Sequence, residues 1–280
     1  MHGEAVSAPG GAYGLGLTGV PGARALLIDA PPHWPALELD VVITSAPEPP
    51  ADIVGDNKAL VRLTSGGSVA IDRESGRVTY SFPDRPADGA IVHPYLAVVA
   101  AVFANWLGRE TFHAGAFVAH GGVWGLLGDK EAGKSSLLAS LARAGVPVVS
   151  DDLLVLEDGR ALAGPRSIDL REGAASRLEA GEPMGVIGGR ERWRLALDPV
   201  AAELPMLGWV TLSWGERAEV RPVRGSERLR TLGAHRGARL YPPEPKALIE
   251  LSALPFLELR RPRDWASAGE AVRRLLDGIG

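Results

Sequence analysis

The chain has 280 residues, 46% of them hydrophobic and 23% charged, a balance typical of a folded globular protein and not of a disordered one. Its net charge of −4 gives no electrostatic reason to expect nucleic-acid binding, and the lack of cysteine excludes disulfides and zinc–thiolate sites. The first residues, Met1-His2-Gly3-Glu4, lack the basic-then-apolar order of a secretory signal, and the longest apolar run, residues 95–107, is shorter than the roughly 20 residues of a membrane helix. We therefore expect a soluble, cytoplasmic protein with no nucleic-acid partner and no membrane partner.

Residues 1–92 are predicted to form a β-rich N-terminal domain. Short runs of alternating apolar residues between Gly- and Pro-rich turns predict strands at 25–28, 37–44, 60–63, 68–71 and 77–82. Residues 72–76 have the turn chemistry of a hairpin between the last two strands. Helical periodicity first occurs at residues 94–107, which predicts a buried helix at the start of a second domain, residues 93–280.

The second domain alternates hairpins with single helices. Residues 116–120 and 123–127 flank Gly121-Gly122 and predict one hairpin, and residues 153–156 and 160–163 flank Asp158-Gly159 and predict another. A helix is expected at 134–144, a buried strand at 146–149 and a mobile Gly-rich loop at 181–189. Further strands are expected at 208–213, 218–223 and 256–259, and further helices at 226–232 and 264–276. This order predicts an α/β protein with a mixed, α+β-like sheet in place of a doubly wound parallel one.

A phosphate-binding loop is predicted where the first of these hairpins meets the helix at 134–144. Residues 128–135 read Gly-Asp-Lys-Glu-Ala-Gly-Lys-Ser and fit the pattern G-x-x-x-x-G-K-[ST] between an apolar strand and a helix. In such a loop the backbone N–H groups and the helix N-terminus surround an anion, Lys134 reaches the β- and γ-phosphates, and the Ser135 hydroxyl ligates Mg²⁺. We therefore predict ATP and Mg²⁺ as cofactors, with the nucleotide held by Gly128, Asp129, Lys130, Glu131, Ala132, Gly133, Lys134, Ser135 and Ser136.

Two features of this motif leave alternatives open. A Gly-rich turn with an exposed lysine would give the same pattern. The carboxylate of Glu131 should weaken phosphate binding unless its side chain turns outward or Lys130 offsets its charge.

Two adjacent carboxylates, Asp151 and Asp152, follow the buried strand at 146–149. Neighbouring side chains on an extended backbone point to opposite sides. One carboxylate can therefore face the metal while the other faces an acceptor hydroxyl as a general base. The alternative is a solvated strand end without a chemical role.

Taken together, His113, the hairpin at 116–127, the loop at 128–135, Ser150-Asp151-Asp152 and Asp169-Leu170-Arg171 resemble the catalytic domain of HPr kinase/phosphorylase. The resemblance covers residues 113–172 and keeps the family's spacing from the histidine to the loop and from the loop to the acidic pair. It extends to related kinases of bacterial peptide-tailoring clusters, including those that phosphorylate lasso-peptide precursors. The chain departs from the family at Lys130-Glu131, which replaces a Ser-Gly. The family's signature for the reverse phosphorylase reaction and HPr docking is absent after Arg171.

The resemblance implies a role for each matching residue. Asp151 would accept the proton of the acceptor hydroxyl. His113 would lie beside the acidic pair and steer the protonation of that pair; a core histidine is the alternative for His113. Asp152 and Asp169 would join Ser135 at the metal. Arg171 would neutralise the transferring phosphoryl group, with a surface ion pair as the alternative. The Arg-rich residues 190–194 could close over the phosphates or form a solvated face.

Three functions remain open from the sequence. The first is an ATP-dependent serine kinase that acts on a Ser or Thr hydroxyl of a peptide or protein acceptor, with a lasso-type precursor peptide as one such acceptor. The second is a small-molecule kinase, because the same groups serve any acceptor that lines up with the γ-phosphate. The third is a nucleotide-binding partner protein with weak ATPase activity. The resemblance also makes a homo-oligomer one of the expected forms.

Overall fold

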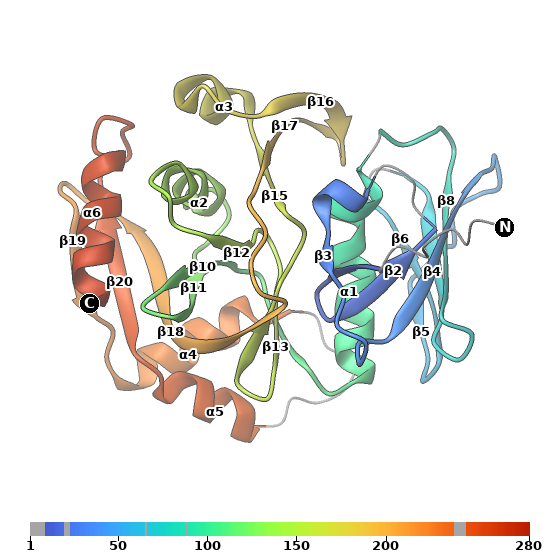
Figure 1. Ribbon diagram of the computed structural model, residues 1–280, viewed down its shortest axis with the longest axis horizontal. Helices are drawn as coiled ribbons and strands as arrows, with labels where there is room; N and C mark the ends of the chain where they lie inside the picture. The colour runs from blue at the N-terminus through green and yellow to red at the C-terminus, as the bar shows by residue number, and fades with distance from the viewer. Residues whose placement is uncertain (1–8, 20–22, 65, 88, 238–244) are drawn as a thin grey trace, which may run out of the picture.

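The computed structural model describes residues 9–19, 23–64, 66–87, 89–237 and 245–280. Within these ranges the chain forms one sheet of eight strands, one of nine and one of three, with helices between and around them (Figure 1). The nine-stranded sheet contains both parallel and antiparallel pairs. The predicted mixed α/β architecture is therefore observed.

The eight-stranded sheet is formed by residues near the N-terminus, in the order β3-β1-β2-β4-β8-β7-β6-β5. Its strands alternate in burial: along β4, Leu37 and Leu39 face the core while Glu38 and Asp40 face solvent. The strands are β1 (Gly10–Ala12), β2 (Leu15–Thr18), β3 (Ile28–Asp29), β4 (Ala36–Ile43), β5 (Ile53–Val54), β6 (Lys58–Arg62), β7 (Ser68–Asp72) and β8 (Arg77–Phe82).

The predictions for this sheet hold for the long strands and fail at a short one. Residues 37–44, 60–63, 68–71 and 77–82 fall on β4, β6, β7 and β8, and the hairpin between the last two is present. Residues 25–28 were predicted as a strand, but Arg24–Leu26 is a 3₁₀ turn and only Ile28 belongs to β3. The Arg24 guanidinium donates to the carbonyls of Leu27 and Ile28, which holds the chain in this turn.

Helix α1 (Leu96–Trp106) lies between the N-terminal sheet and the edge of the nine-stranded sheet (Figure 1). Nearly all faces of α1 are apolar, which suits a helix that is covered by one sheet on one side and by the other sheet on the other. One continuous core joins Tyr80 of the first sheet, Phe103 of α1 and Phe112 of the second sheet. The predicted domain boundary at residues 92–93 falls in the segment Ile91–Tyr95, which is kinked at His93 and leads into α1.

The nine-stranded sheet runs in the order β12-β10-β11-β18-β14-β13-β9, and β20, with β19 beside it, also pairs with β18. Side chains along β11 alternate between its two faces: Trp124 and Leu126 pack with α2 and α6, whereas Val123 and Leu127 belong to the core that contains α1. The strands are β9 (Glu110–Phe112), β10 (Gly115–Ala119), β11 (Gly122–Leu127), β12 (Val148–Ser150), β13 (Leu154–Glu157), β14 (Arg160–Leu162), β18 (Glu203–Trp214), β19 (Glu219–Pro222) and β20 (Phe256–Arg261). The helices are α2 (Lys134–Arg143), α4 (Gly225–His235), α5 (Pro245–Ala253) and α6 (Ala268–Ile279).

Both predicted hairpins of this sheet are present, with one change in a turn. The turn between β13 and β14 uses Asp158 and Gly159 at φ values of 47° and 73°. The turn between β10 and β11 was predicted at Gly121-Gly122, but its left-handed residues are His120 and Gly121, at 52° and 80°, and Gly122 already belongs to β11. The ladder pairs Ala119 with Gly122, which leaves only two residues for the turn.

The third sheet, β15-β17-β16, corrects a prediction for the Gly-rich segment. Residues 181–189 were predicted as a mobile loop, but Glu182–Ile187 is strand β16, paired with β17 (Arg190–Ala196). Backbone hydrogen bonds hold this strand in the sheet. Such bonds do not depend on the side chain, so the strand can contain a glycine. Strand β17 also pairs with β15 (Ser167–Leu170), which is followed by the short helix α3 (Glu172–Leu178).

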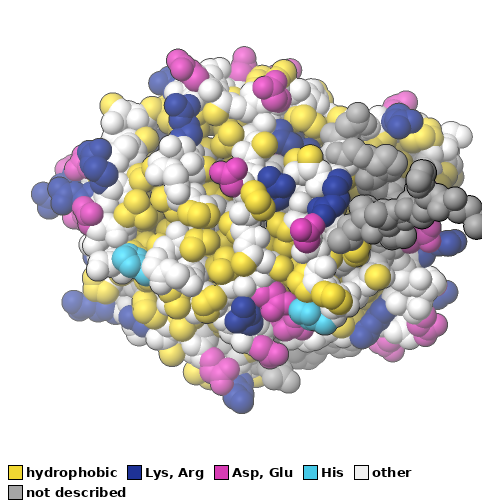
Figure 2. Space-filling model, viewed as in Figure 1, with side chains coloured by type: hydrophobic (Ala, Val, Ile, Leu, Met, Phe, Trp, Pro, Cys, Tyr) yellow, Lys and Arg dark blue, Asp and Glu magenta, His cyan; other side chains and the backbone are white. Residues whose placement is uncertain are grey.

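Two further observations concern the length of the helices and the charges on the surface. Among the residues that the structure describes, no helix is long and apolar enough to cross a membrane. On the face shown in Figure 2, basic and acidic side chains are interspersed around apolar ones.

Candidate functional site

The phosphate-binding motif forms a tight loop between buried strand β11 and helix α2. Gly133 precedes the helix with φ 83°, a left-handed conformation that favours glycine. A Cβ at this position would lie 2.5 Å from Nη2 of Arg261, so a side chain there would displace this guanidinium. No side chain caps the N-terminus of α2, which leaves its first N–H groups directed at the loop. The local context predicted from the sequence is therefore present.

Lys134 turns back toward the loop that precedes it. Its Nζ donates to the Gly128 carbonyl over 2.6 Å and lies 3.3 Å from Nε2 of His113. Burial lowers the pKa of Lys134, while Asp152 and Asp151 act in the opposite direction. The ammonium group thus lies at the centre of the loop, where the motif requires a positive charge.

His113 joins the loop to the acidic pair. Its Nδ1 lies 3.1 Å from the backbone carbonyl of Asp152 and can donate to it, while Nε2 can accept from Lys134. Burial first, and then the charge of Lys134, lower the pKa of His113, which favours the neutral ring that these two contacts require. His113 is half-exposed at the cavity and is not a core histidine.

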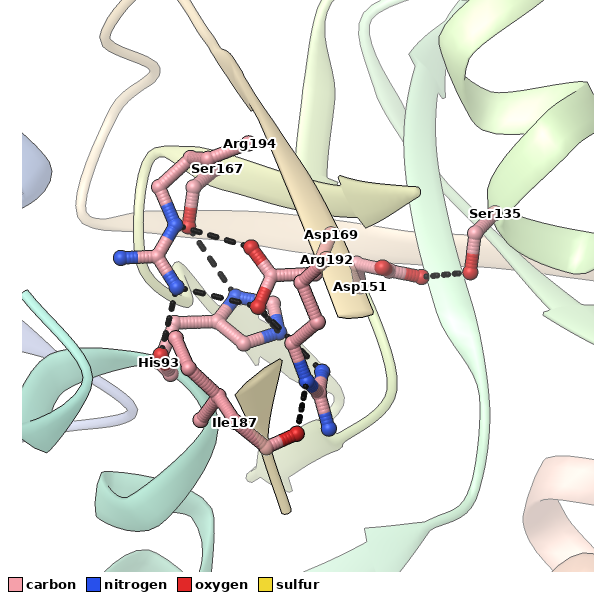
Figure 3. A network of polar contacts seen from close by, with 8 residues as sticks. All are labelled: His93, Ser135, Asp151, Ser167, Asp169, Ile187, Arg192 and Arg194. Atoms are coloured by element: carbon pink, nitrogen blue, oxygen red, sulfur yellow. Dashed lines mark hydrogen bonds and ion pairs between the residues drawn. The ribbon is translucent and has the colours of Figure 1, made fainter. Parts of the chain in front are cut away.

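Asp151 and Asp152 face different surroundings, as expected of adjacent residues. Asp151 is 3% exposed, and its Oδ1 accepts a hydrogen bond of 3.0 Å from the Ser135 hydroxyl (Figure 3). Burial first, and then the neighbouring Asp152, raise the pKa of Asp151 to about 7. Asp152 has a φ of 73°, and its side chain is 42% exposed. Asp152, and not Asp151, lines the cavity beside the loop.

The cavity that contains these groups has a volume of about 690 Å³. It reaches from Asp152, across the loop and the first turns of α2, to the ends of β18 and β20. It brings together many residues predicted for the site and several that were not predicted. The predicted ones are His113, Asp129, Lys130, Glu131, Gly133, Lys134, Ser135, Ser136, Asp152, Asp169 and Arg171, and the others include Trp214, Arg261, Arg263, Asp264 and Trp265.

Glu131, the acidic residue inside the loop, is paired with Arg171 at the start of α3. Arg171 Nη1 lies 3.2 Å from Glu131 Oε1, and both side chains are about half-exposed. The ion-pair partner of Glu131 in the structure is therefore Arg171, a residue that the sequence did not indicate for this role. Arg171 forms an ion pair and lines the cavity beside the loop at the same time.

Asp169 is part of a buried ion network, and its surroundings differ from those of a free metal ligand (Figure 3). Its Oδ1 accepts from Arg194 Nε at 2.8 Å, and its Oδ2 accepts from Arg194 Nη2 at 3.0 Å and from Arg192 Nη1 at 3.2 Å. Burial opposes ionisation of Asp169, but the charges of His93, Arg194 and Arg192 outweigh it and lower its pKa. A metal at this carboxylate would have to share both oxygens with two guanidinium groups.

The same network fixes Arg192 and Arg194, two members of the Arg-rich segment. Arg194 also donates to the backbone carbonyl of His93 at 2.6 Å, and Arg192 donates to the carbonyl of Ile187. These arginines are buried and do not form a solvated face, whereas Arg190 of the same strand lines the cavity. Of this segment only Arg190 is placed to meet a bound phosphate.

The metal site predicted at Ser135, Asp152 and Asp169 is not a preformed cluster of carboxylates. Within the described ranges, no three His, Asp or Glu side chains come together as a group that could hold a metal ion. Hard oxygen donors near the loop include the Ser135 hydroxyl and the carboxylates of Asp151 and Asp152.

Other residues at the site carried no sequence signal that identified them. Arg261 donates to the carbonyls of Ala132 and Gly133 over 3.0 and 3.3 Å, and thereby holds the loop from a strand far along the chain. Tyr13 of the N-terminal sheet is buried, and burial first, followed by the charges of Asp152 and Asp151, raises its pKa. Only the fold brings Arg261 to the loop and Tyr13 close enough to the acidic pair to feel its charge.

No protein-family model and no curated protein matches the chain. Among solved structures, the chain is similar to the HPr(Ser) kinase/phosphatase from Coxiella burnetii, with 12% sequence identity and a TM-score of 0.31. The alignment covers 60% of this chain and 95% of that chain. Likeness at this level does not show a shared family or a shared activity.

Proposed function

We propose that the protein is an ATP-dependent kinase that transfers the γ-phosphoryl group to a hydroxyl of a peptide or protein. One observation carries the proposal. The loop hydroxyl of Ser135 donates a hydrogen bond to the buried carboxylate of Asp151, while the next carboxylate, that of Asp152, lines the same cavity as Lys134. A metal position and a candidate base thus lie on adjacent residues beside the phosphate-binding loop.

The residues present fit a nucleoside triphosphate with Mg²⁺. The left-handed Gly133 and the uncapped start of α2 leave backbone N–H groups free to surround phosphate oxygens. Lys134 supplies positive charge, and the oxygens of Ser135 and Asp151 are of the type that Mg²⁺ prefers. When bound, Mg²⁺-ATP supplies the transferable phosphoryl group and neutralises part of its charge.

The exposure of the two carboxylates supports a division of roles that reverses the one implied by the family resemblance. A general base must come within hydrogen-bond reach of the acceptor, which requires it to face the cavity. Asp152 does so, and Asp151 is enclosed beside Ser135. In this proposal Asp152 takes the proton of the acceptor hydroxyl, and Asp151 holds the Ser135 hydroxyl and the metal in place.

His113 and Arg171 have supporting roles in the proposal. His113 donates to the Asp152 carbonyl and holds this residue in its left-handed conformation beside Lys134. Arg171 can leave Glu131 for a more highly charged phosphate oxygen at the cavity. Because the Glu131 side chain is about half-exposed, solvent screens its charge even when Arg171 moves, so this charge does not favour a non-catalytic nucleotide-binding protein.

The test is transfer of labelled phosphate from Mg²⁺-ATP to three kinds of acceptor: peptides containing Ser or Thr, a whole-protein acceptor such as casein, and small polyols. Incorporation into a peptide or protein hydroxyl is expected. Incorporation only into small polyols would instead identify a small-molecule kinase. No incorporation and no ADP formation at saturating ATP would reject the proposal.

A further inference from the structure

Three neighbouring parallel strands end at the same edge of the nine-stranded sheet. Strand β11 runs into the phosphate-binding loop, β18 is parallel to it, and β20 is parallel to β18. Ligands of α/β sheets bind beyond the carboxyl ends of such strands. The last residues of β18 and β20, Trp214 and Arg261, are paired in register at this edge, and both line the cavity.

Trp214 is held beside the loop by a buried arginine. The Arg261 guanidinium lies 4.6 Å from the centre of the Trp214 ring and donates to the loop carbonyls of Ala132 and Gly133. Trp214 nevertheless remains 36% exposed, which is uncommon for so large an apolar side chain. A Cβ added to Gly133 would lie 3.5 Å from this indole, so the ring is within contact distance of the loop.

A second tryptophan lies on the segment that follows β20. Trp265 lines the same cavity just before α6. The turn that carries it is fixed by Asp264, whose Oδ1 accepts the Ser267 N–H over 3.1 Å. Arg263, between the two tryptophans in the sequence, places its guanidinium 5.7 Å from the Trp214 ring. The cavity therefore has a wall of aromatic and cationic side chains, which lies at the ends of β18 and β20.

We propose that this wall, formed by Trp214, Arg263 and Trp265, binds the nucleobase of the nucleotide by stacking. The inference rests on the proposed function, because it assigns the part of the ligand that extends beyond the phosphates. A wall of indole rings and a guanidinium offers flat, polarisable surfaces that match the face of a heteroaromatic base. The phosphates then lie on the loop, and the base lies at the ends of β18 and β20.

The experiment compares two ligands that differ in the base. Calorimetry measures the dissociation constants of Mg²⁺-ATP and of Mg²⁺-tripolyphosphate, which has the phosphates but no nucleoside. The variants are Trp214→Ala, Trp265→Ala and Trp214→Phe. Trp193→Ala serves as the matched control, because Trp193 is also partly buried but does not line the cavity.

Loss of one stacking ring should weaken ATP binding by about tenfold to a hundredfold and leave tripolyphosphate binding within about twofold of the parent. Trp214→Phe should keep most of the affinity for ATP, and Trp193→Ala should bind both ligands as the parent does. Circular dichroism checks the fold of each variant. If Trp214→Ala does not fold, the dissociation constants of Trp265→Ala for the two ligands provide the test.

Three results would overturn the inference. ATP binding unchanged in both alanine variants would place the base elsewhere. Equal losses for ATP and tripolyphosphate would mean that the tryptophans only support the loop through Arg261. A parent protein that binds tripolyphosphate as tightly as ATP would have no base site, although its phosphate loop would stand. A parent that binds neither ligand would contradict the proposed function itself.

Discussion

Asp151 and Asp152 are adjacent, but the backbone gives them different environments. Asp152 has a left-handed conformation, and His113 donates a hydrogen bond to the Asp152 carbonyl. Together they turn the Asp152 side chain to the cavity, whereas the Asp151 side chain remains enclosed beside Ser135. Sequence patterns show that two carboxylates occur there, but not which one faces the acceptor. Only the backbone angle and the burial distinguish them.

Exchanging each carboxylate for its amide should therefore have different effects. Asp152→Asn should lower the rate of transfer by about 10²–10⁴-fold, the usual cost of losing acid–base assistance, with little change in ATP affinity. Asp151→Asn should raise the Mg²⁺ concentration needed for half-maximal rate, because a metal with few carboxylate ligands depends on each one.

A magnesium titration of the transfer rate, run beside an ATP titration, separates the two variants. If Asp151→Asn loses rate at every magnesium concentration while Asp152→Asn shifts the metal requirement, the two roles are reversed.

At the level of elements, the loop and its flanking β11 and α2 could be predicted because their signals are local. Glycines at fixed spacing, an apolar strand before and a helix after are all contained in a short stretch of sequence. By contrast, the partners of this loop come from β15, β18 and β20, and local sequence contains no information on which strands pair. Trp214, Arg261 and Trp265 were missed for this reason.

The Gly-rich segment at 181–189 and the Arg-rich β17 show a second limit. Glycine and arginine indicate loops or solvated faces when read locally. Here the strand β16 is stabilised by pairing with β17, and two of the arginines are buried because Asp169 of β15 neutralises them. A buried ion network can be recognised only when both of its sides are known.

Gly133→Ala tests the conformation of the loop. At a φ of 83°, an alanine costs roughly 1–2 kcal/mol, and its Cβ would meet the Arg261 guanidinium that holds the loop. We expect lower stability and weaker binding of both ATP and tripolyphosphate, measured by chemical denaturation and calorimetry.

Gly233→Ala is the matched control, because Gly233 lies in helix α4, where an added Cβ meets nothing within 4 Å. This control should be neutral or stabilising by up to about 1 kcal/mol. A Gly133→Ala variant that behaves like the control would mean that the loop does not depend on its left-handed residue.

Asp169→Asn tests the ion network. Removing the carboxylate charge leaves Arg192 and Arg194 buried without compensation, which should lower the free energy of unfolding by about 3 kcal/mol or more. The exposed Asp198→Asn should change it by no more than about 0.5 kcal/mol.

The pH dependence of this effect has a defined sign. Because the pKa of Asp169 is lower in the folded protein than its usual value, its contribution is fully present above about pH 4 and is lost as the pH falls below that. The stability difference between the parent and Asp169→Asn should therefore shrink from pH 5 to pH 3. A constant difference over this range would show that the carboxylate is not the charged partner of the arginines.

In the whole molecule, the N-terminal sheet is tied to the rest of the protein by more than α1. Arg109 joins the Gly14 carbonyl of the first sheet to Glu157 of the second, and Trp34 donates to Glu203 of β18. Together with the continuous core, these contacts predict that both sheets unfold together.

Phe103→Ala in α1 should lower the free energy of unfolding by about 3 kcal/mol or more, since Phe103 is only 2% exposed in this shared core. Denaturation followed by circular dichroism and by limited proteolysis should still give one coincident transition. The exposed Val186→Ala is the control. Two separate transitions would instead establish that residues 1–92 and 93–280 are independent domains.

The rate of ADP formation from Mg²⁺-ATP, measured side by side for the parent and Lys134→Ala, tests the kinase assignment most directly. Lys134 is the only lysine in contact with the loop carbonyls among the described residues, and its charge is needed most when the phosphoryl group is in transfer. We predict that the parent forms ADP, faster when a hydroxyl acceptor is present, and that the variant loses about 10²-fold or more of this rate. No ADP from the parent at saturating Mg²⁺-ATP, or an equal rate in the variant, would contradict the assignment.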